Sequence, residues 1–352
     1  MGGVSVAEQP NLFNFATSEL SQDAFICWLL SWAAPAWAAP DREFDHRLLN
    51  ECAKRLLDIF FEKHQKHHDK HHKIDKPSSY NSVEVRKQDN FIDVLCIINN
   101  DIYVLIEDKT GTENHSDQLC RYVENLKKNI PEDKILPIYF KTGDQSNYGE
   151  IHKNGYIVFS RSDFLEVLND RRMSGITNQI FLDYRNYLQK IDDEVKSYKI
   201  LPVSEWKWES WKGFFIELQH DLLEGGNWGY VPNPSGGFLG FWWHFQEDDQ
   251  CEQYIQLEQE KCCFKIRVND SSQRAKLRNQ WHQIIRDTGC RMGLNIAKPQ
   301  RFGNGQYMTV AILNEEYRKK KTNGTIDMSS TVDFLKKAEI VLETIATKGV
   351  TH

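Results

Sequence analysis

The stretch from residue 91 to residue 109, FIDVLCIINNDIYVLIEDK, constrains the fold more than any other part of this sequence. Two apolar runs, at 91–98 and 102–106, flank a cluster of turn-forming residues at 99–101, and this arrangement predicts a β-hairpin. Neither run alternates cleanly between apolar and polar residues. Both faces of these strands should therefore be covered, as in the middle of an α/β sheet.

Charged side chains interrupt the apolar pattern of this hairpin. Asp93 lies in the first strand, and Glu107 and Lys109 lie at the end of the second. A buried carboxylate is costly unless it is paired or binds a metal. A two- or three-residue turn places Asp93 opposite residue 106, 107 or 108, and Glu107 and Lys109 share one face of their strand because they are two residues apart. If the register centres on 107, two acids and an amine converge at one sheet edge, which suits a divalent cation.

Composition excludes several classes of protein. At 352 residues the chain is long enough for a sizeable core and is expected to form two domains. No apolar run approaches the ~20 residues of a membrane-spanning helix, and the apolar stretch at 24–39 does not resemble a signal peptide. The eight scattered cysteines contain no CxxC pair, which favours reduced thiols in a cytoplasm. The net charge of −6 disfavours a broadly basic nucleic-acid binder but allows local basic patches.

The N-terminal part of the chain predicts an α/β domain over residues 1–199. Its pattern gives helices, then a strand and the hairpin, then further helices and strands, so we expect a mixed sheet with helices on both faces. The predicted elements are helices at 19–33 and 43–61, strands at 82–86, 91–98 and 102–109, a helix at 117–128, strands at 136–140 and 155–159, and helices at 162–169 and 177–196.

Composition shifts near residue 200, where tryptophans cluster before a stretch dense in turn formers. We predict a separate, smaller α+β domain over 200–352, with a possible recognition role that the sequence does not define. Its predicted elements are strands at 238–245, 254–258, 262–268 and 306–313, a helix at 272–287 that stops at Gly289, and a final helix at 329–347.

The charged residues of the hairpin resemble a known signature. Asp93, followed by Glu107-Asp108-Lys109 at the end of the next strand, is similar to the motif of the PD-(D/E)XK nuclease superfamily, and the helix-first order resembles its restriction-endonuclease-like core. The segments NFATSELSQDAFICWLL, IDVL, IEDK and QLCRY resemble a poorly characterised prokaryotic family of this superfamily. The resemblance covers roughly residues 11–190. One departure is Ile92, which stands where the motif has proline.

Two flanking helices strengthen the resemblance. Glu19 begins the first helix, where many members of the superfamily place an additional acid. The segment from Gln118 to Tyr122 resembles the Gln-x-x-x-Tyr element of the exonuclease-like branch. Gln118 and Tyr122 are four residues apart and share one helical face, so they and Arg121 are candidates for positioning the substrate strand or Lys109.

The resemblance implies a metal-dependent nuclease that uses Mg²⁺ or Mn²⁺ and hydrolyses phosphodiester bonds, in DNA rather than RNA. The cysteine pattern places it in the cytoplasm, and a homo-oligomer is left open. Asp93, Glu107 and the backbone carbonyl of Asp108 would bind the metal, and Glu19 would hold a second metal or a metal-bound water. Lys109 would orient the attacking water or stabilise the transition state. The side chain of Asp108 points away from Glu107 and is not expected to be a ligand.

Each assignment has a plainer alternative. Asp93, Glu107 and Lys109 would also fit a structural ion pair, and Glu19 would suit any helix N-terminus. Gln118 and Tyr122 would suit an ordinary helix surface. For the whole protein, the alternatives are a non-catalytic nucleic-acid- or protein-binding module that retains the nuclease fold, and a ribonuclease.

Four further features are interpreted as structural. The His/Lys stretch at 64–72 could bind a transition metal, but a solvated helix end accounts for it better. Glu84 is interpreted as an exposed strand residue, and the basic run at 318–321 as an exposed turn, with a phosphate contact left open. The aromatic residues between 206 and 245 are interpreted as core packing rather than as a surface on which bases stack.

Overall fold

The computed structural model describes residues 10–67, 74–89, 92–111, 116–222, 225–233 and 236–348. The chain divides into two compact units, 1–192 and 193–352, and each is described by itself. The boundary at 199/200 suggested by composition stays a prediction.

The first unit contains a five-stranded mixed sheet in the order β1-β2-β3-β4-β5. Strands β1, β2 and β3 are antiparallel neighbours, whereas β3, β4 and β5 run parallel. The strands span β1 (Val83–Asp89), β2 (Ile92–Ile98), β3 (Ile102–Lys109), β4 (Ile135–Lys141) and β5 (Ile157–Ser160). The mixed α/β class predicted from the sequence is confirmed.

The predicted hairpin is formed by β2 and β3. Asn99 and Asn100 both have positive φ angles, of 55° and 54°, a conformation that asparagine tolerates better than most residues. The side-chain oxygen of Asn99 also accepts a hydrogen bond from the backbone N–H of Asn81 at 2.7 Å. Val94 pairs with Ile106, so the register continues with residue 93 facing residue 107, as the convergence of charged residues required.

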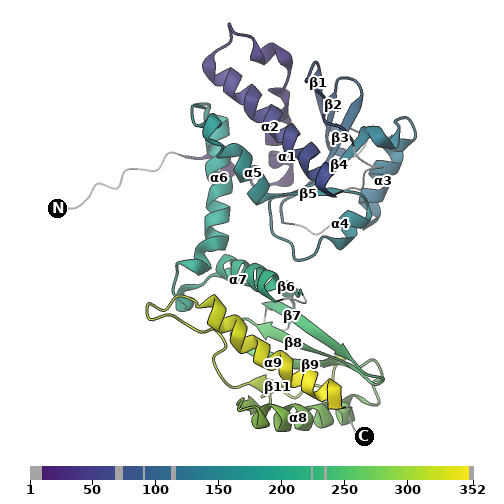
Figure 1. The fold of residues 1–352 in the computed structure, drawn as a ribbon, viewed down its shortest axis with the longest axis vertical. Coiled ribbons are helices and arrows are strands. Elements are labelled where there is room, and N and C mark those ends of the chain that lie inside the picture. Colours follow the sequence, from purple (N-terminus) through teal and green to yellow (C-terminus); the bar gives the residue numbers. More distant parts are fainter. Residues whose placement is uncertain are drawn as a thin grey trace, which may run out of the picture. The chain divides into compact units, whose positions relative to one another are not determined.

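Helices cover both faces of this sheet, as predicted (Figure 1). Alternate residues of β2 and β3 point into two separate apolar cores, one on each face. The larger core is built with α1 (Glu19–Ser31), α2 (Phe44–His67), α5 (Arg161–Leu168) and α6 (Gln179–Lys196). The smaller core is built with α3 (Ser116–Lys127) and the short α4 (Gly149–Lys153).

Helix α2 extends further than predicted. The sequence analysis ended it near residue 61, but it continues to His67, and His64 continues its buried stripe. The polar His/Lys composition hid this extension, because the buried positions of the last turns are occupied by a histidine rather than an aliphatic residue. His64 is therefore buried, contrary to the interpretation of this segment as a solvated end.

The second unit contains a six-stranded antiparallel sheet in the order β10-β11-β9-β8-β7-β6. The helices α7 (Trp208–Asp221), α8 (Arg274–Arg291) and α9 (Met328–Lys348) build one core with a single face of this sheet. The strands are β6 (Asn227–Val231), β7 (Phe238–Glu247), β8 (Glu252–Glu258), β9 (Lys261–Arg267), β10 (Ile296–Ala297) and β11 (Tyr307–Leu313).

Besides the unpredicted strands β6 and β10, three features of the second unit differ from the expectations. Helix α7 was not predicted, because it is rich in aromatic residues of modest helix propensity and depends on burying them in the core. Helix α8 continues through Gly289, which was predicted to end it, and stops before Gly293, whose φ is +76°. Gly289 instead serves close packing, since a Cβ there would come within 2.6 Å of the Ile296 side chain. Arg318 is buried against Trp211 and Glu316, so the run at 318–321 is not simply an exposed turn.

Across the described ranges, we find no helix with the length and apolar character required to cross a membrane.

Candidate active site

Three carboxylates converge on one lysine at the end of β3. The Nζ atom of Lys109 lies 2.9 Å from the carboxylate of Glu107, 3.7 Å from that of Glu19 and 3.9 Å from that of Asp93. Nζ also donates a hydrogen bond to the backbone carbonyl oxygen of Asp108 at 3.0 Å. The structure thus brings together the four residues that the sequence analysis selected as catalytic candidates. Their roles stay predictions.

Backbone groups at the end of β3 hold two of these acids in place. Asp93 accepts a hydrogen bond from the N–H of Asp108 at 2.9 Å, and Glu19 accepts one from the N–H of Thr110 at 3.2 Å. Asp93 arrives there through the register of the hairpin. Glu19 arrives there because the first turn of α1 packs beside β3, which sequence spacing alone could not show.

Glu107 is the most unusual group of the site. Its side chain is fully buried, at 0% exposure, and among the described residues neither of its carboxylate oxygens has a hydrogen-bond donor other than the Lys109 ammonium. Burial, and then repulsion from Asp93, raise the pKa of Glu107 to about 7. A buried carboxylate beside a second carboxylate is stabilised by a cation.

Lys109 supplies part of that positive charge. Burial alone would lower the pKa of Lys109, but Glu107, Asp93 and Glu19 together raise its pKa above the ordinary value. Its ammonium group therefore remains charged and stands among the oxygen atoms that the sequence analysis assigned to a metal ion.

The donor set fits a hard divalent cation. Mg²⁺ and Mn²⁺ prefer carboxylate and carbonyl oxygens, and Asp93, Glu107, Glu19 and the carbonyl of Asp108 supply such atoms around one point. Among the residues that the structure describes, no three His, Cys, Asp or Glu side chains are close enough to hold a metal, and the Lys109 ammonium lies within 4 Å of all three acids. Metal binding would require this lysine to move aside.

A buried hydrogen-bond network, which the sequence analysis missed, lies on the face of β3 opposite Glu107 and supports the site. The side chain of Asp108 is fully buried on the opposite face from Glu107 and accepts a hydrogen bond from Gln22. The Gln22 carbonyl oxygen in turn accepts hydrogen bonds from Thr142 at 2.7 Å and Tyr184 at 3.0 Å. This network ties α1 to β3, to the residue after β4 and to α6.

Asp23 adds a further buried acid to this region. It lies one turn after Glu19 on α1, and burial, followed by repulsion from Asp93, raises its pKa to about 6. A sequence signal for Gln22 and Asp23 existed: they are polar residues three and four positions after Glu19 in a mostly apolar helix.

Replacing Gln22 by alanine should destabilise the protein by about 2 to 4 kcal/mol, because the buried Asp108, Thr142 and Tyr184 would each lose a hydrogen-bond partner. Urea denaturation measures this change. The matched control is Gln179→Ala, which removes an exposed hydrogen bond to Asp183 and should cost less than about 0.5 kcal/mol. Equal losses in the two variants would show that the network does not hold the site.

The candidate positioning residues lie on α3. The Gln118 side chain falls outside the described residues, and Arg121 is exposed. Tyr122 is buried in the core on the Glu107 face of the sheet. Tyr156, which nothing in the sequence singled out, lies on the same face: its hydroxyl donates to the Leu119 carbonyl at 3.2 Å, and burial, followed by Glu107 and Tyr122, raises its pKa.

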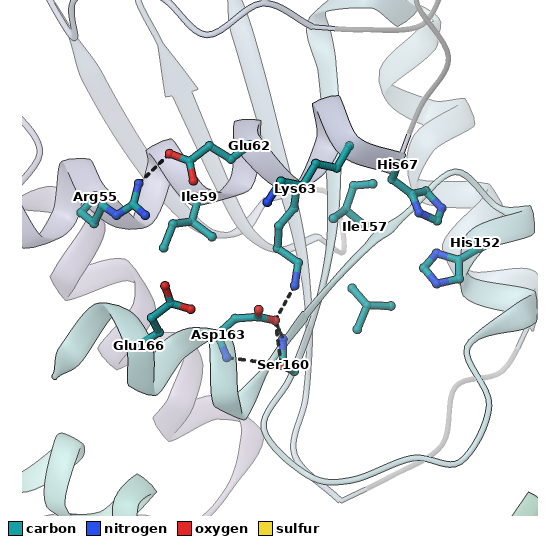
Figure 2. Close-up of a pocket in the computed structure, with 12 residues that line it drawn as sticks. Arg55, Ile59, Glu62, Lys63, His67, His152, Ile157, Ser160, Asp163 and Glu166 are labelled. Atoms are coloured by element: carbon teal, nitrogen blue, oxygen red, sulfur yellow. Dashed lines mark hydrogen bonds and ion pairs between the residues drawn. The ribbon is translucent and has the colours of Figure 1, made fainter. Parts of the chain in front are cut away.

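A separate pocket of about 510 Å³ lies beside the edge strand β5 (Figure 2). Two of its cations are paired: Lys63 contacts Asp163 at 2.6 Å and Arg55 contacts Glu62 at 2.6 Å. The charge of these two groups is therefore neutralised without a ligand, and the pocket differs in this respect from the site around Glu107.

The His/Lys stretch contributes Lys66 and His67 to that pocket. The ring of His67 lies 4.2 Å from the ring of His152 (Figure 2). His68, His71 and His72 fall outside the described residues. Glu84 is exposed and pairs with Arg86 at 2.7 Å, in agreement with its interpretation as a surface residue.

A helix-flanked mixed sheet with an Asp, a Glu and a Lys gathered at the end of β3 defines a restriction-endonuclease-like domain. A family model described as the PD-(D/E)XK nuclease superfamily matches residues 10–200, and the chain belongs to this superfamily. No curated protein and no solved structure matches the chain. Membership points to nuclease chemistry on a nucleic acid, and members of the superfamily typically use divalent metals.

Proposed function

We propose that this protein is a nuclease that hydrolyses phosphodiester bonds in DNA with the help of Mg²⁺ or Mn²⁺. The observation that carries the proposal is the fully buried Glu107, which faces Asp93 and has Lys109 as its cationic neighbour. A structural ion pair would need one acid for one lysine. Here three carboxylates surround a single ammonium group, an excess of negative charge that a divalent cation would balance.

Each residue has a role in this proposal. Asp93, Glu107 and the carbonyl of Asp108 would hold the metal, and Glu19 would bind a second ion or a water molecule. When bound, the metal would activate water and offset the charge of the scissile phosphate. Lys109 would turn from the acids toward the phosphate and stabilise the negative charge that develops there. Tyr122, with Gln118 and Arg121, would position the substrate strand.

We also propose that the protein acts in the cytoplasm. All eight cysteines are free thiols, which agrees with a reducing cytoplasm. A homo-oligomer stays open. The alternative of a non-catalytic binding module is disfavoured because the acid and lysine set is complete and assembled at one point.

Asp93→Asn should reduce DNA cleavage by about 100- to 1000-fold, because it removes a metal ligand and leaves the shape of the site unchanged. The assay incubates the full chain with plasmid DNA, linear duplex, single-stranded DNA and RNA in Mg²⁺ or Mn²⁺, with EDTA as the negative control. Glu84→Gln is the matched control, since it neutralises an exposed acid outside the site. Full activity of Asp93→Asn would contradict the site, and cleavage of RNA alone would replace DNA by RNA as the substrate.

A further inference from the structure

The sheet of the second unit has one face that no helix in the described residues covers. Helices α7, α8 and α9 all join the core on the other face, together with Phe241, Ile255 and Ile266. Residues adjacent to these in the strands, such as Trp242, Tyr254 and Arg267, must point the opposite way because side chains alternate along a strand. None of the three belongs to the core with the helices, although Tyr254 is buried.

This face is hollowed into a groove of about 490 Å³. Four aromatic side chains and two cations line it, beside the acid Glu252, and these six are together called the aromatic groove: Trp242, Phe245, Tyr254, Lys265, Arg267 and Tyr307. Lys265 is paired across the strands with Tyr254, and Arg267 with Tyr307. Four strands, β7, β8, β9 and β11, therefore contribute to one surface.

A β-bulge completes the aromatic part of the groove. The register of β7 and β8 shifts between Trp243 and Gln246, and His244 has a positive φ of 55°. The bulge re-aims the next side chain, so that Phe245 stacks on Tyr254 with ring centroids 5.2 Å apart and planes 21° apart. Without the bulge, strict alternation would break this stack.

The groove presents two exposed aromatic rings and one buried N–H group that has no acceptor among the described residues. Tyr307 is 57% exposed and Phe245 is 45% exposed, although both are large aromatic side chains. The Nε atom of Arg267 is buried and has no hydrogen-bond partner among the described residues; its guanidinium carbon lies 5.7 Å from the Tyr307 ring. A buried donor without an acceptor is uncommon, and a bound ligand with an acceptor oxygen would satisfy it.

We propose that the aromatic groove binds single-stranded DNA. Unpaired bases stack on aromatic rings, and each such stack contributes about 1 to 3 kcal/mol. In a duplex the same base faces are stacked on their neighbours and do not reach the rings. Lys265 and Arg267 would contact phosphates, although Glu258 at 3.2 Å and Glu252 at 3.8 Å now neutralise part of their charge.

The choice of DNA as the ligand rests on the proposed function, whereas the groove itself lies outside the range that matches the nuclease superfamily. In this proposal the second unit binds single-stranded DNA through the groove, and the first unit carries out the cleavage. It also revises the interpretation of the aromatic residues near 242–245 as core, since Trp242 and Phe245 lie on the face away from it.

The test measures binding of a fluorescein-labelled single-stranded oligonucleotide to the full chain by fluorescence anisotropy, in EDTA so that cleavage does not interfere. Tyr307→Ala, Phe245→Ala and Arg267→Gln should each weaken binding by about 5- to 100-fold. Tyr307→Phe keeps the ring and should bind like the wild type. Trp208→Ala is the matched control, because Trp208 is exposed in the same unit outside the groove, and thermal melting checks that every variant is folded.

Three outcomes would overturn the inference. The first is wild-type affinity in all three groove variants. The second is tighter binding of a duplex or of RNA of the same sequence than of single-stranded DNA. The third is loss of self-association, instead of DNA binding, in the groove variants, which would make the groove a contact between copies of the chain. The binding assay and the cleavage assay test the two proposals separately. Groove variants that lose DNA binding in EDTA support the inference about the groove, whether or not the wild type cuts DNA in the cleavage assay.

Discussion

Replacing Lys109 by methionine should slow DNA cleavage strongly and at the same time strengthen the binding of divalent metal. The Lys109 ammonium contacts the carboxylates of Glu107, Glu19 and Asp93 and the carbonyl of Asp108. These are the oxygen atoms proposed to hold the metal, so the ammonium and the metal compete for one position.

The size of both effects follows from the charge that is removed. Two unit charges 4 Å apart interact by about 4 kcal/mol at an effective dielectric constant of about 20, so loss of the ammonium should tighten metal binding by tenfold or more. Loss of a cation that stabilises the transition state should lower the cleavage rate by about 100- to 1000-fold. Without metal, the variant should also be less stable, because three acids lose their common partner.

Calorimetric titration with Mn²⁺ and the plasmid cleavage assay measure the two effects. Lys134→Met is the matched control, since Lys134 pairs with Asp101 at an exposed position away from the site. Weaker metal binding by Lys109→Met would show that the lysine does not compete with the ion. Cleavage at the wild-type rate would remove Lys109 from the mechanism.

Replacing Glu107 by glutamine should abolish metal binding and cleavage but should make the metal-free protein more stable at neutral pH. Burial and Asp93 raise the pKa of Glu107 from 4.5 to about 7. A carboxyl group whose pKa is raised by folding binds its proton more tightly in the native state. The loss of folding stability caused by ionising Glu107 is therefore absent below pH 4.5, grows as the pH rises toward 7, and is constant above that.

The shift corresponds to a free energy on the order of 3 kcal/mol. The wild type without metal should lose this much stability between about pH 4.5 and pH 7, and Mg²⁺ should restore it at the upper end, where the carboxylate is ionised. Glu107→Gln should show neither the loss nor the recovery. Urea denaturation across this range, with EDTA or with Mg²⁺, measures both.

The exposed Glu84→Gln variant serves as the control and should follow the wild type. If Mg²⁺ stabilised Glu107→Gln as much as it stabilises the wild type, Glu107 would not be a metal ligand. If the metal-free wild type kept its stability as the pH rises, the buried carboxylate would have a partner other than Lys109.

Much of the candidate site follows from local sequence. The hairpin and its turn depend on neighbours within 20 positions, because a short turn of Asn99 and Asn100 leaves only residues 106, 107 and 108 as partners for Asp93, and the structure selects 107. The alternation of side chains along β3 then decides that Glu107 and Lys109 share a face and that Asp108 does not. These features, and the resemblance to the nuclease superfamily, needed no tertiary information.

Other parts of the molecule depend on packing between distant segments. Glu19 reaches Thr110 only because α1 docks on the end of β3, and Gln22 meets Asp108, Thr142 and Tyr184 for the same reason. Helix α7 and the extension of α2 exist because buried side chains override weak local preferences.

The sequence by itself determined the mixed α/β class of the first unit, the hairpin and the three charged residues near its end, and it limited the partner of Asp93 to residue 106, 107 or 108; the structure selected 107. Only the tertiary structure decided that a third acid joins them, that a lysine stands among the acids, and that four strands of the second unit form the aromatic groove. The reason is physical: strand register and side-chain alternation are local and periodic, whereas the docking of α1 and the order of strands in a sheet are set by burial of apolar surface between segments far apart in the chain.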